Sequence, residues 1–363
     1  MDETLVLEEY SEEKHDLIVD LLTNVFDGWP KIDIDVSSVD YWKWKYLKNP
    51  LEKRNICYYI DDRIVACSHR IPKKCIIRDL EFYANQGADA AVDPAYRGRG
   101  LWNNLRDLHD LIDQRNGINF SYFITGNQII IDKFNKSPQY QRIPHKLIPL
   151  VRIIDVDKHL KIMPMDNPEI VKIGYRMISA IQKTIYPSKK KTIETEYVKL
   201  QDINLNPFWE KIKTQYDFIF EKTQHYLEWR YSSEIANYDF VISKKEDEIT
   251  GILVLLINRY RNDYPIGYIL ECLTAPDDTE SMTSLLHEAN KYFDKENVNI
   301  IQLLSINQKM VKCARENGYV VAPIDIHAYI QQKESTDSVN IEKLTTLYFS
   351  WGDHDSLPIG LKN

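Results

Sequence analysis

The sequence predicts an α/β (α+β) fold made of two tandem domains, each with a central sheet flanked by helices. Strand-like apolar runs alternate with amphipathic helical runs along the chain. A strand, a glycine-rich turn and a helix follow one another between residues 88 and 117. A distinctive segment of the first half returns in the second half, and a length of 363 residues suits two domains better than one.

The first 150 residues predict one domain. Ser11 is expected to cap an amphipathic helix that ends before Gly28, and Gly117 holds a position typical of a helix C-terminus. The other expected elements are a strand over 5–7, a helix over 41–50, paired strands over 56–60 and 64–71, a long strand over 79–92, a helix from 101, a strand over 120–124 and a helix over 125–134.

The second half of the chain repeats the first. The segment DYWKWKY (residues 40–46) returns as HYLEWRY (residues 225–231), and the strand pair that follows it returns as well. Echoes that keep one register indicate a tandem duplication. We therefore expect a first domain over residues 1–150, a connector with a helix (residues 167–181) over residues 151–196, and a second domain over residues 197–363.

Composition narrows the classes of partner. The chain is 44% hydrophobic and 28% charged, and its formal net charge of −8 speaks against a nucleic-acid partner. The five cysteines are odd in number and show no metal-ligand spacing, so we expect reduced thiols, no metal site and a cytoplasmic location. No signal peptide or membrane-spanning run is expected.

The glycine turn predicts an anion-binding site. Arg97-Gly98-Arg99-Gly100 joins the end of a strand to a helix that begins at Leu101. The N–H groups in the first turn of such a helix point at one place, where the helix dipole favours an anion. The two glycines allow close approach of the backbone, and the two arginines add positive charge. A phosphate or pyrophosphate is the expected ligand.

The same stretch resembles the acyl-CoA-binding loop of the GNAT acetyltransferase superfamily. The resemblance rests on Val92-Asp93-Pro94 followed by Arg97-x-x-Gly100. It implies mixed, mostly antiparallel sheets, acetyl-CoA as the acyl donor, and no metal. Trp102 departs from the pattern, because the family prefers a small residue there. The residues that the resemblance implies for donor binding are Ala90, Ala91, Val92, Arg97, Gly98, Arg99, Gly100, Leu101, Trp102, Asn127 and Phe134.

The resemblance implies direct attack of an amine on the thioester, with one group taking a proton from the amine and another returning one to the sulfur. Many members of the family use a tyrosine as the acid, and this chain has Phe134 at that position. Phenylalanine cannot donate a proton. Tyr122 and Tyr140 are therefore the candidate acids.

The position of the catalytic base also differs from the pattern of the family. Some members use a glutamate on the long strand, where this chain has Gln86. Asp89 is the nearest carboxylate, and it is our predicted catalytic residue. His354, which lies between two aspartates near the C-terminus, is a second candidate because an imidazole has a suitable ordinary pKa.

The second copy is expected to lack a donor site. In place of the glycine turn it has the segment TAPDDTE (residues 274–280), whose acidic residues would repel a pyrophosphate. The sequence therefore predicts an acetyl-CoA-dependent N-acetyltransferase that acts on a primary amine of a small molecule, such as an amino sugar. The alternatives are a non-catalytic acetyl-CoA-binding sensor or scaffold and, with least support, an aminoacyl-tRNA-dependent transferase of the Fem type.

Overall fold

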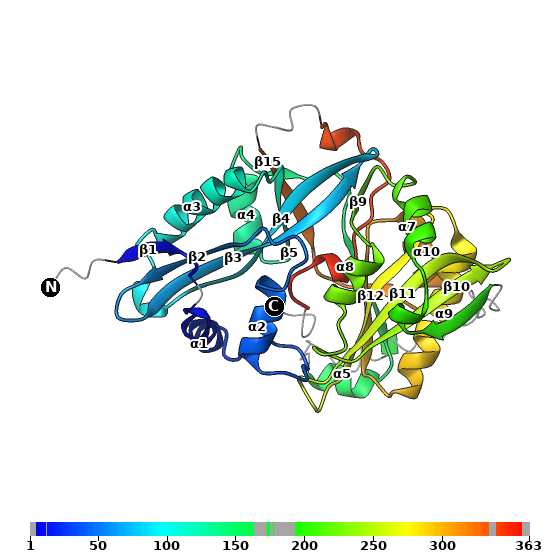
Figure 1. The fold of residues 1–363 in the computed structure, drawn as a ribbon. Coiled ribbons are helices and arrows are strands. Elements are labelled where there is room, and N and C mark those ends of the chain that lie inside the picture. The colour runs from blue at the N-terminus through cyan, green and yellow to red at the C-terminus, as the bar shows by residue number, and fades with distance from the viewer. Residues whose placement is uncertain are drawn as a thin grey trace.

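The computed structural model describes residues 5–11, 13–162, 193–333 and 339–357, together with residues 173, 174 and 177. It contains two mixed sheets flanked by helices (Figure 1), which confirms the predicted fold class. The first half contributes β1 (Val6–Glu9), α1 (His15–Val25), α2 (Ser38–Tyr46), β2 (Asn55–Ile60), β3 (Ile64–Ile77), β4 (Leu80–Val92), α3 (Leu101–Arg115), β5 (Phe120–Thr125), α4 (Gln128–Asn135), β6 (Gln141–Arg142), β7 (Ile148–Ile153) and α5 (Val156–Ile162).

The second half contributes β8 (Glu194–Val198), α7 (Asn206–Lys213), β9 (Phe218–Phe220), α8 (Gln224–Arg230), β10 (Tyr238–Lys245), β11 (Glu248–Asn258), β12 (Ile266–Thr274), α9 (Thr279–Lys295), β13 (Ile300–Ser305), α10 (Gln308–Glu316), β14 (Val320–Val321) and β15 (His327–Gln332). Single 3-10 turns form at Pro94–Tyr96, Leu200–Asp202, Ile341–Lys343 and Trp351–Asp353.

Most predicted elements form near their expected bounds, and the differences have local causes. β3 runs on to Ile77 because it pairs with β4 along its whole length. α1 has Lys14 at its N-cap and no side-chain cap, so the predicted cap by Ser11 is wrong. α2 begins earlier than expected because the Ser37 hydroxyl accepts the N–H of Asp40. Most of the helix expected in the connector lies outside the described residues.

Both sheets follow one plan. The first has the strand order β1-β2-β3-β4-β5-β15-β6, with β9 beside β3, and the second has the order β14-β7-β13-β12-β11-β10-β8. One parallel pair lies inside each sheet, β4 with β5 and β12 with β13. The other strand pairs among the described residues are antiparallel.

The two halves of the chain exchange strands. β7 comes from the first half but pairs with β13 in the second sheet, and β15 comes from the second half but pairs with β5 in the first sheet. β9 also crosses over and pairs with β3 at Cys75–Ile77. Each sheet is therefore completed by the other half of the chain, whereas the predicted boundaries at residues 150 and 197 follow the order of the sequence. The division into separate domains stays a prediction.

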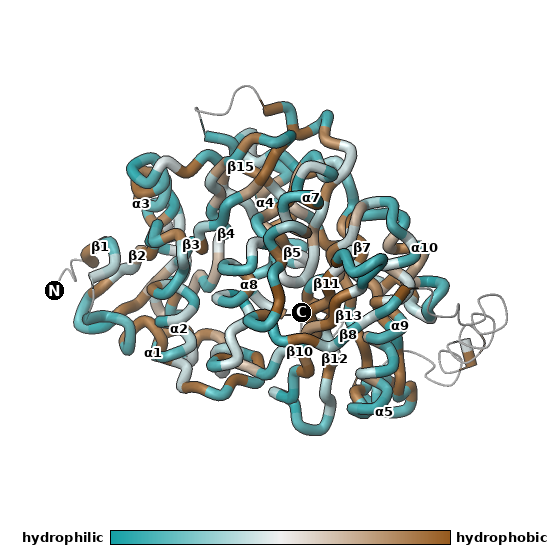
Figure 2. Tube along the Cα trace, turned by 45° about the vertical axis from the view of Figure 1, so that its right-hand side comes forward, coloured by the Kyte–Doolittle hydropathy of each residue, from teal (hydrophilic) through white to brown (hydrophobic). Residues whose placement is uncertain are grey.

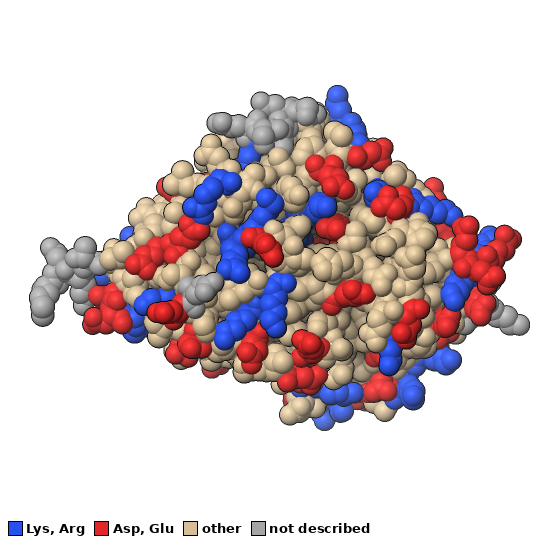
Figure 3. All heavy atoms as spheres, viewed as in Figure 1, with Lys and Arg blue, Asp and Glu red and all other residues tan. Residues whose placement is uncertain are grey.

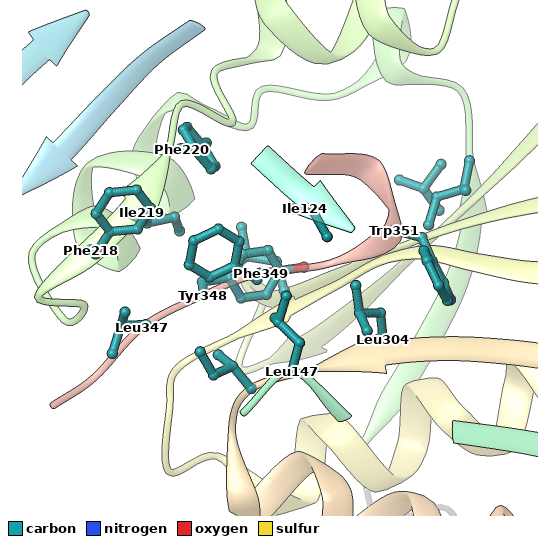
Figure 4. Packing of buried hydrophobic residues seen from close by; sticks show 14 of the residues in the cluster. Ile124, Leu147, Phe218, Ile219, Phe220, Leu304, Leu347, Tyr348, Phe349 and Trp351 are labelled. Carbon is teal, nitrogen blue, oxygen red and sulfur yellow. The ribbon is translucent and has the colours of Figure 1, made fainter. Parts of the chain in front are cut away.

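The largest buried cluster joins the two sheets to the C-terminal segment. It takes Ile124 from β5 and Leu304 from β13, together with residues 347–349 and Trp351. Figure 4 shows Tyr348, Phe349 and Trp351 among these side chains. The Phe349 ring stacks on Phe218 with 5.3 Å between the centroids. The C-terminal segment is thus part of the core and is held in place by apolar burial.

The repeated segments meet each other face to face. Trp44 of α2 and Trp229 of α8 stack with 5.5 Å between their rings. Trp44 Nε1 donates to the carbonyl of Trp229 (2.9 Å), and Trp229 Nε1 donates to the carbonyl of Trp44 (3.3 Å). Equivalent residues of the two copies therefore exchange equivalent hydrogen bonds. The two repeated helices, α2 and α8, are therefore in direct contact through matching residues.

Hydropathy and charge follow the expected separation between interior and surface. Figure 2 shows hydrophobic and hydrophilic residues alternating along the helices, and hydrophobic residues on many of the central strands. Acidic and basic side chains are interspersed over the face shown in Figure 3. All five cysteines are buried. In the part of the chain that the structure describes, no helix combines the length and apolar character that crossing a bilayer requires.

Candidate active site between the two sheets

The glycine turn leaves the start of α3 open. Gly100 is the N-cap of α3 with a φ of 76°, and no side chain caps the helix. Arg97 and Arg99 are exposed and donate hydrogen bonds to the backbone carbonyls of Val92 (3.3 Å) and Ala95 (3.4 Å). The Arg99 guanidinium also lies over the Tyr96 ring, 4.6 Å from its centroid. A built Cβ on Gly98 or Gly100 would meet nothing within 4 Å. Exposed N–H groups and two guanidinium groups thus surround an open space that can hold a pyrophosphate.

The second copy closes the corresponding place with its own side chains. Asp278 is the N-cap of α9, and its carboxylate accepts the N–H of Ser281 at 3.0 Å. Asn307 caps α10, and its Nδ2 donates to the carbonyl of Pro276 at 2.9 Å. A negative charge thus occupies the helix N-terminus where the first copy offers free N–H groups.

β4 and β5 separate directly before the glycine turn. Their last paired residues are Gln86 and Tyr122, so β4 continues from Gly87 to Val92 without a partner on that side. Ala90 is exposed there, while Ala91 is buried. An unpaired strand edge offers backbone N–H and C=O groups to an extended ligand. The predicted role of residues 90–92 in binding the pantetheine arm therefore has a suitable backbone.

Four further residues predicted to bind the donor lie on α3 and α4 or at their starts and have different surroundings: Leu101, Trp102, Asn127 and Phe134. Leu101 and Phe134 are buried, the first against the sheet and the second in an aromatic cluster with Phe123, Tyr140 and Tyr329, so packing explains both side chains. Lys133 Nζ lies 5.5 Å from the Trp102 ring centroid, which brings α4 close to α3. Asn127 caps α4 through Oδ1, which accepts N–H groups at 3.0 and 3.4 Å. Their contacts to a donor stay predictions.

Asp89 lies in a β-bulge and is fully engaged. The register of β3 and β4 shifts beside it, and its φ is 38°. Its carboxylate accepts hydrogen bonds from Trp29 Nε1 (3.0 Å), Lys45 Nζ (2.7 Å) and the Tyr46 hydroxyl. Burial alone would raise the pKa of Asp89, but the charge of Lys45 outweighs it and holds the pKa below its usual range. A carboxylate in this state has little tendency to take a proton.

The second copy repeats this arrangement at Glu271. The register of β11 and β12 also shifts beside Glu271. Its carboxylate accepts the hydroxyl of Tyr231 (2.8 Å) and the ammonium of Lys222 (2.5 Å). Tyr231 is the residue of HYLEWRY that matches Tyr46 of DYWKWKY. An acid and a tyrosine at the bulge are therefore common to both copies, which favours a structural role for Asp89; its role as a base stays a prediction.

A small pocket lies between the two sheets, where α2 meets α8. Its walls come from both copies and from the C-terminal segment, and one wall is Gln86, the last β4 residue paired with β5. In Figure 1 the red C-terminal turn lies beside α8. The pocket is lined by Trp44, Lys45, Ile71, Lys73, Gln86, Tyr226, Trp229, Arg230, His354 and Asp355.

Lys73 and Tyr122 connect this pocket to the C-terminal segment. Lys73 is 3% exposed, and its Nζ donates to the backbone carbonyl of Asp353 at 3.0 Å. Burial lowers the pKa of Lys73 to about 7. The Tyr122 hydroxyl lies 3.0 Å from Gln86 Oε1 and 3.1 Å from the same carbonyl. Only one polar atom of the buried Gln86 side-chain amide lies near a partner, so the other has none, whichever way the amide is turned.

His354, the second candidate base, lies at the fork. Its Nε2 is 3.0 Å from the carbonyl of Ile124, two residues beyond the last β4–β5 pair. Its Nδ1 is 3.1 Å from the backbone N–H of Ser356. A carbonyl requires a donor at Nε2 and an N–H requires an acceptor at Nδ1, so these contacts fit a neutral ring with its proton on Nε2. Both ring nitrogens are thus engaged.

Sequence reasoning missed several groups in the pocket wall. Tyr226 and Arg230 belong to the repeated HYLEWRY segment, so the repeat itself could have pointed to them. No sequence pattern marks Lys73 as part of a pocket, because its surroundings depend on Asp353, which is far away in the sequence. Across the described ranges, no three or more His, Cys, Asp or Glu side chains are arranged to hold a metal ion.

Comparisons with known proteins agree with this geometry. Residues 7–129 match the family described as acetyltransferase (GNAT) domain. No curated protein matches the chain. The solved structures of similar fold include a probable N-acyltransferase from Enterococcus faecalis, with a TM-score of 0.59, 11% identity, and coverage of 90% of this chain and 72% of that one.

Two further structures share the fold. A GCN5-related N-acetyltransferase from Anabaena variabilis has a TM-score of 0.58 and 13% identity, with coverage of 90% of this chain and 72% of that one. N-myristoyltransferase from Saccharomyces cerevisiae, solved with bound myristoyl-CoA, has a TM-score of 0.61 and 13% identity, with coverage of 91% and 83%. The matched segment ends at the start of α4 and so contains the whole glycine turn and fork. Residues 7–129 of this chain therefore resemble the GNAT acetyltransferase family in sequence, and the whole chain shares its fold with N-acyltransferases of known structure.

Proposed function

We propose that this protein is an acetyl-CoA-dependent N-acetyltransferase that acts on a primary amine of a small molecule. One observation carries the proposal: the uncapped start of α3, with its two exposed arginines, opens beside the fork of β4 and β5 that leads to the pocket between the sheets. An acyl-CoA needs a phosphate site, a strand edge and an acceptor pocket in this order. The family match of residues 7–129 supports the same reaction class.

Each part of the donor has a proposed contact. The N–H groups at the start of α3 and the guanidinium groups of Arg97 and Arg99 hold the pyrophosphate. The open edge of β4 at residues 90–92 pairs with the pantetheine arm. A backbone N–H near the bulge stabilises the negative charge that develops on the thioester oxygen. The carbonyl carbon then lies at the fork, next to the pocket.

The transfer itself needs no covalent enzyme intermediate. The amine nitrogen forms a bond to the thioester carbonyl carbon, the carbon–sulfur bond breaks, and the sulfur leaves with the electron pair and takes a proton. An acceptor that arrives as an ammonium ion releases one proton before attack and a second on forming the amide, so one net proton goes to solvent. The Tyr122 hydroxyl, whose pKa burial raises well above its ordinary value, is protonated and lies at the fork. We assign it as the acid.

A substitution at Gly100 tests the donor site. Gly100→Asp puts a carboxylate at the start of α3, and Gly100→Asn is the matched control, because both side chains tolerate a positive φ and have open space. We expect Gly100→Asp to bind acetyl-CoA at least tenfold more weakly than Gly100→Asn by calorimetry, since only the former adds a negative charge. Equal affinities for the two variants would contradict the assignment of the pyrophosphate site.

A panel of primary amines tests the reaction. With the intact chain and acetyl-CoA, release of the free thiol should depend on an added amine. Tight binding of acetyl-CoA with no amine-dependent release would favour the alternative, a non-catalytic sensor. The Gly100→Asp protein serves as the control for release that does not pass through this site.

A further inference from the structure

Two cationic side chains line the pocket without a carboxylate partner. Arg230 Nη2 donates to the backbone carbonyl of His354 at 3.3 Å, and Lys73 Nζ donates to the carbonyl of Asp353 at 3.0 Å. Within the described ranges of the chain, neither makes an ion pair. A buried cation without an anion is costly, so such a pair favours a ligand that brings a negative charge.

The duplication explains why Arg230 is available. It matches Lys45 in the repeat, and Lys45 pairs with the bulge carboxylate of Asp89 at 2.7 Å. In the second copy the bulge carboxylate of Glu271 pairs instead with Lys222, at 2.5 Å. Lys222 has taken over the role that Arg230 would have by symmetry. Arg230 therefore keeps its charge and most of its five N–H groups for another partner.

The acids near Lys73 are already engaged. The carboxylate of Asp353 accepts from Lys222 at 2.8 Å and from the backbone N–H of Ser350 at 3.0 Å. Lys73 reaches only the main-chain carbonyl of Asp353. The ammonium of Lys73 is thus surrounded by rings and carbonyl oxygens, at 5.6 Å from the Tyr122 centroid and 5.3 Å from that of Phe220.

Unpartnered polar atoms in the same wall point independently to a ligand. The Tyr226 hydroxyl is buried with no hydrogen-bond partner among the described residues, and Tyr226 is 3% exposed. The side-chain amide of Gln86, which is 1% exposed, also keeps one unpaired atom. Buried polar groups are normally satisfied, and orphans in a pocket wall are explained by a ligand or ordered water.

The pocket is also lined by a negatively charged residue. The carboxylate of Asp355 lines the wall and is 14% exposed. Asp355 Oδ1 lies 3.4 Å from Nδ1 of His354, which already accepts the N–H of Ser356. Asp355 can therefore receive the ammonium form of an amine. Asp355 and the two cationic residues without a carboxylate partner, Arg230 and Lys73, thus line the same pocket.

We infer that the acyl acceptor is an amine that also carries a carboxylate, a free amino acid, whose carboxylate binds Arg230 and Lys73 and whose amine binds beside Asp355. This inference rests on the proposed function and names the substrate class of its acceptor site. The product is the N-acylated amino acid, formed by the transfer described above, with the new bond at the amine nitrogen. The carboxylate takes no part in the bond changes.

Binding of matched pairs of ligands tests the inference without any need for turnover. The probes are the common L-amino acids and their α-amides, which keep the amine and remove the negative charge. Trp44 and Trp229 line the pocket, so their fluorescence reports occupancy. We expect at least one amino acid to bind the intact chain at least tenfold more tightly than its amide, the effect of one charge-assisted pair. The amine of an α-amide has a lower pKa than the amine of the free amino acid, so more of it is neutral and able to attack the thioester. Faster turnover of the amino acid than of its amide must therefore come from tighter binding.

Two sets of variants identify the partners. Arg230→Gln should remove the preference for the acid, and Arg230→Lys, which restores the residue type of the first copy, should recover most of it. Lys73→Gln should reduce the preference, whereas Lys74→Gln, at the neighbouring and more exposed position paired with Glu81, should leave it unchanged. Circular dichroism and acetyl-CoA affinity report whether each variant is folded.

The outcomes separate this inference from the proposed function. Equal binding of amino acids and amides, or no binding of either, would overturn the inference, and acetyl transfer to other amines would still support the proposed function. Preferential binding of an amino acid with no thiol release would support the acceptor class while contradicting the reaction. Unchanged preference in a folded Arg230→Gln protein would also overturn the assignment of the carboxylate site.

Discussion

Replacing Lys73 by methionine should stabilise the protein at neutral pH. The folded chain holds this ammonium in a site where burial lowers its pKa to about 7, from the usual 10.5. The charged groups that act on it are Asp353 and Glu271, which favour the charge, and Lys222 and Arg230, which oppose it. Because the pKa of Lys73 is lower in the folded state, the unfolded chain binds more protons than the folded chain between pH 7 and 10.5. The free energy of unfolding therefore rises with pH in that range.

The size of the effect follows from the same values. The difference between 10.5 and about 7, at about 1.4 kcal/mol for each pH unit, gives a penalty on the order of 5 kcal/mol below pH 7. Methionine has a similar length and carries no charge, so it removes this penalty. The Tyr122 hydroxyl lies 3.1 Å from the carbonyl of Asp353 and can donate to it when the Lys73 ammonium is removed. The gain on substitution should shrink by up to about 1.4 kcal/mol for each pH unit above 7.

Denaturant unfolding of both proteins at pH 7, 8 and 9 measures this difference. The free energy of unfolding should be higher for Lys73→Met at pH 7, and the two values should converge as the pH rises. Lys74→Met is the matched control and should show no such convergence, because Lys74 is partly exposed and lies near Glu81. A difference between Lys73→Met and the natural protein that does not change with pH would refute the reasoning.

Three other outcomes follow from the contacts described. Asp89→Asn leaves the Lys45 ammonium buried without its partner and should lower the free energy of unfolding by about 3–5 kcal/mol. If the variant instead keeps the natural unfolding midpoint and acetyl-CoA affinity but loses turnover, Asp89 is the base. A fragment that ends at residue 196 lacks β9 and β15 and should show no cooperative unfolding by circular dichroism, whereas a sharp transition would contradict the importance of the strand exchange. Calorimetry should give one acetyl-CoA for each chain, because Asp278 occupies the start of α9, and a value of two would contradict that reading.

Local sequence patterns were enough to predict α3 and the glycine turn before it. The spacing of Leu101, Leu105 and Ile112 indicated α3, and the glycine turn before it indicated an open helix N-terminus. The repeat of DYWKWKY as HYLEWRY indicated the duplication, and the two segments form matching helices that meet at their tryptophans. Such features depend on residues close to one another in the chain, and periodicity reports them directly.

The pocket between the two sheets depends on contacts that local sequence patterns do not contain. The exchange of β7 and β15 is a choice of pairing partner far along the chain, and alternation of residue types within a strand does not specify it. The environment of Lys73 is set by Asp353, which is 280 residues away. The bonds of Asp89 depend on a bulge and on the end of α2. These features follow from tertiary packing, which is why Asp89 looked like a free carboxylate in the sequence.

Amine-dependent consumption of acetyl-CoA by the intact chain tests the central claim most directly. The measurement follows thiol release and identifies the acylated product by mass, with the common amino acids and their amides as acceptors and Gly100→Asp as the control. We expect thiol release that requires an amine, an N-acetylated product, and strongly reduced release by Gly100→Asp. Bound acetyl-CoA with no N-acetylated product from any acceptor, or equal release by Gly100→Asp, would contradict it.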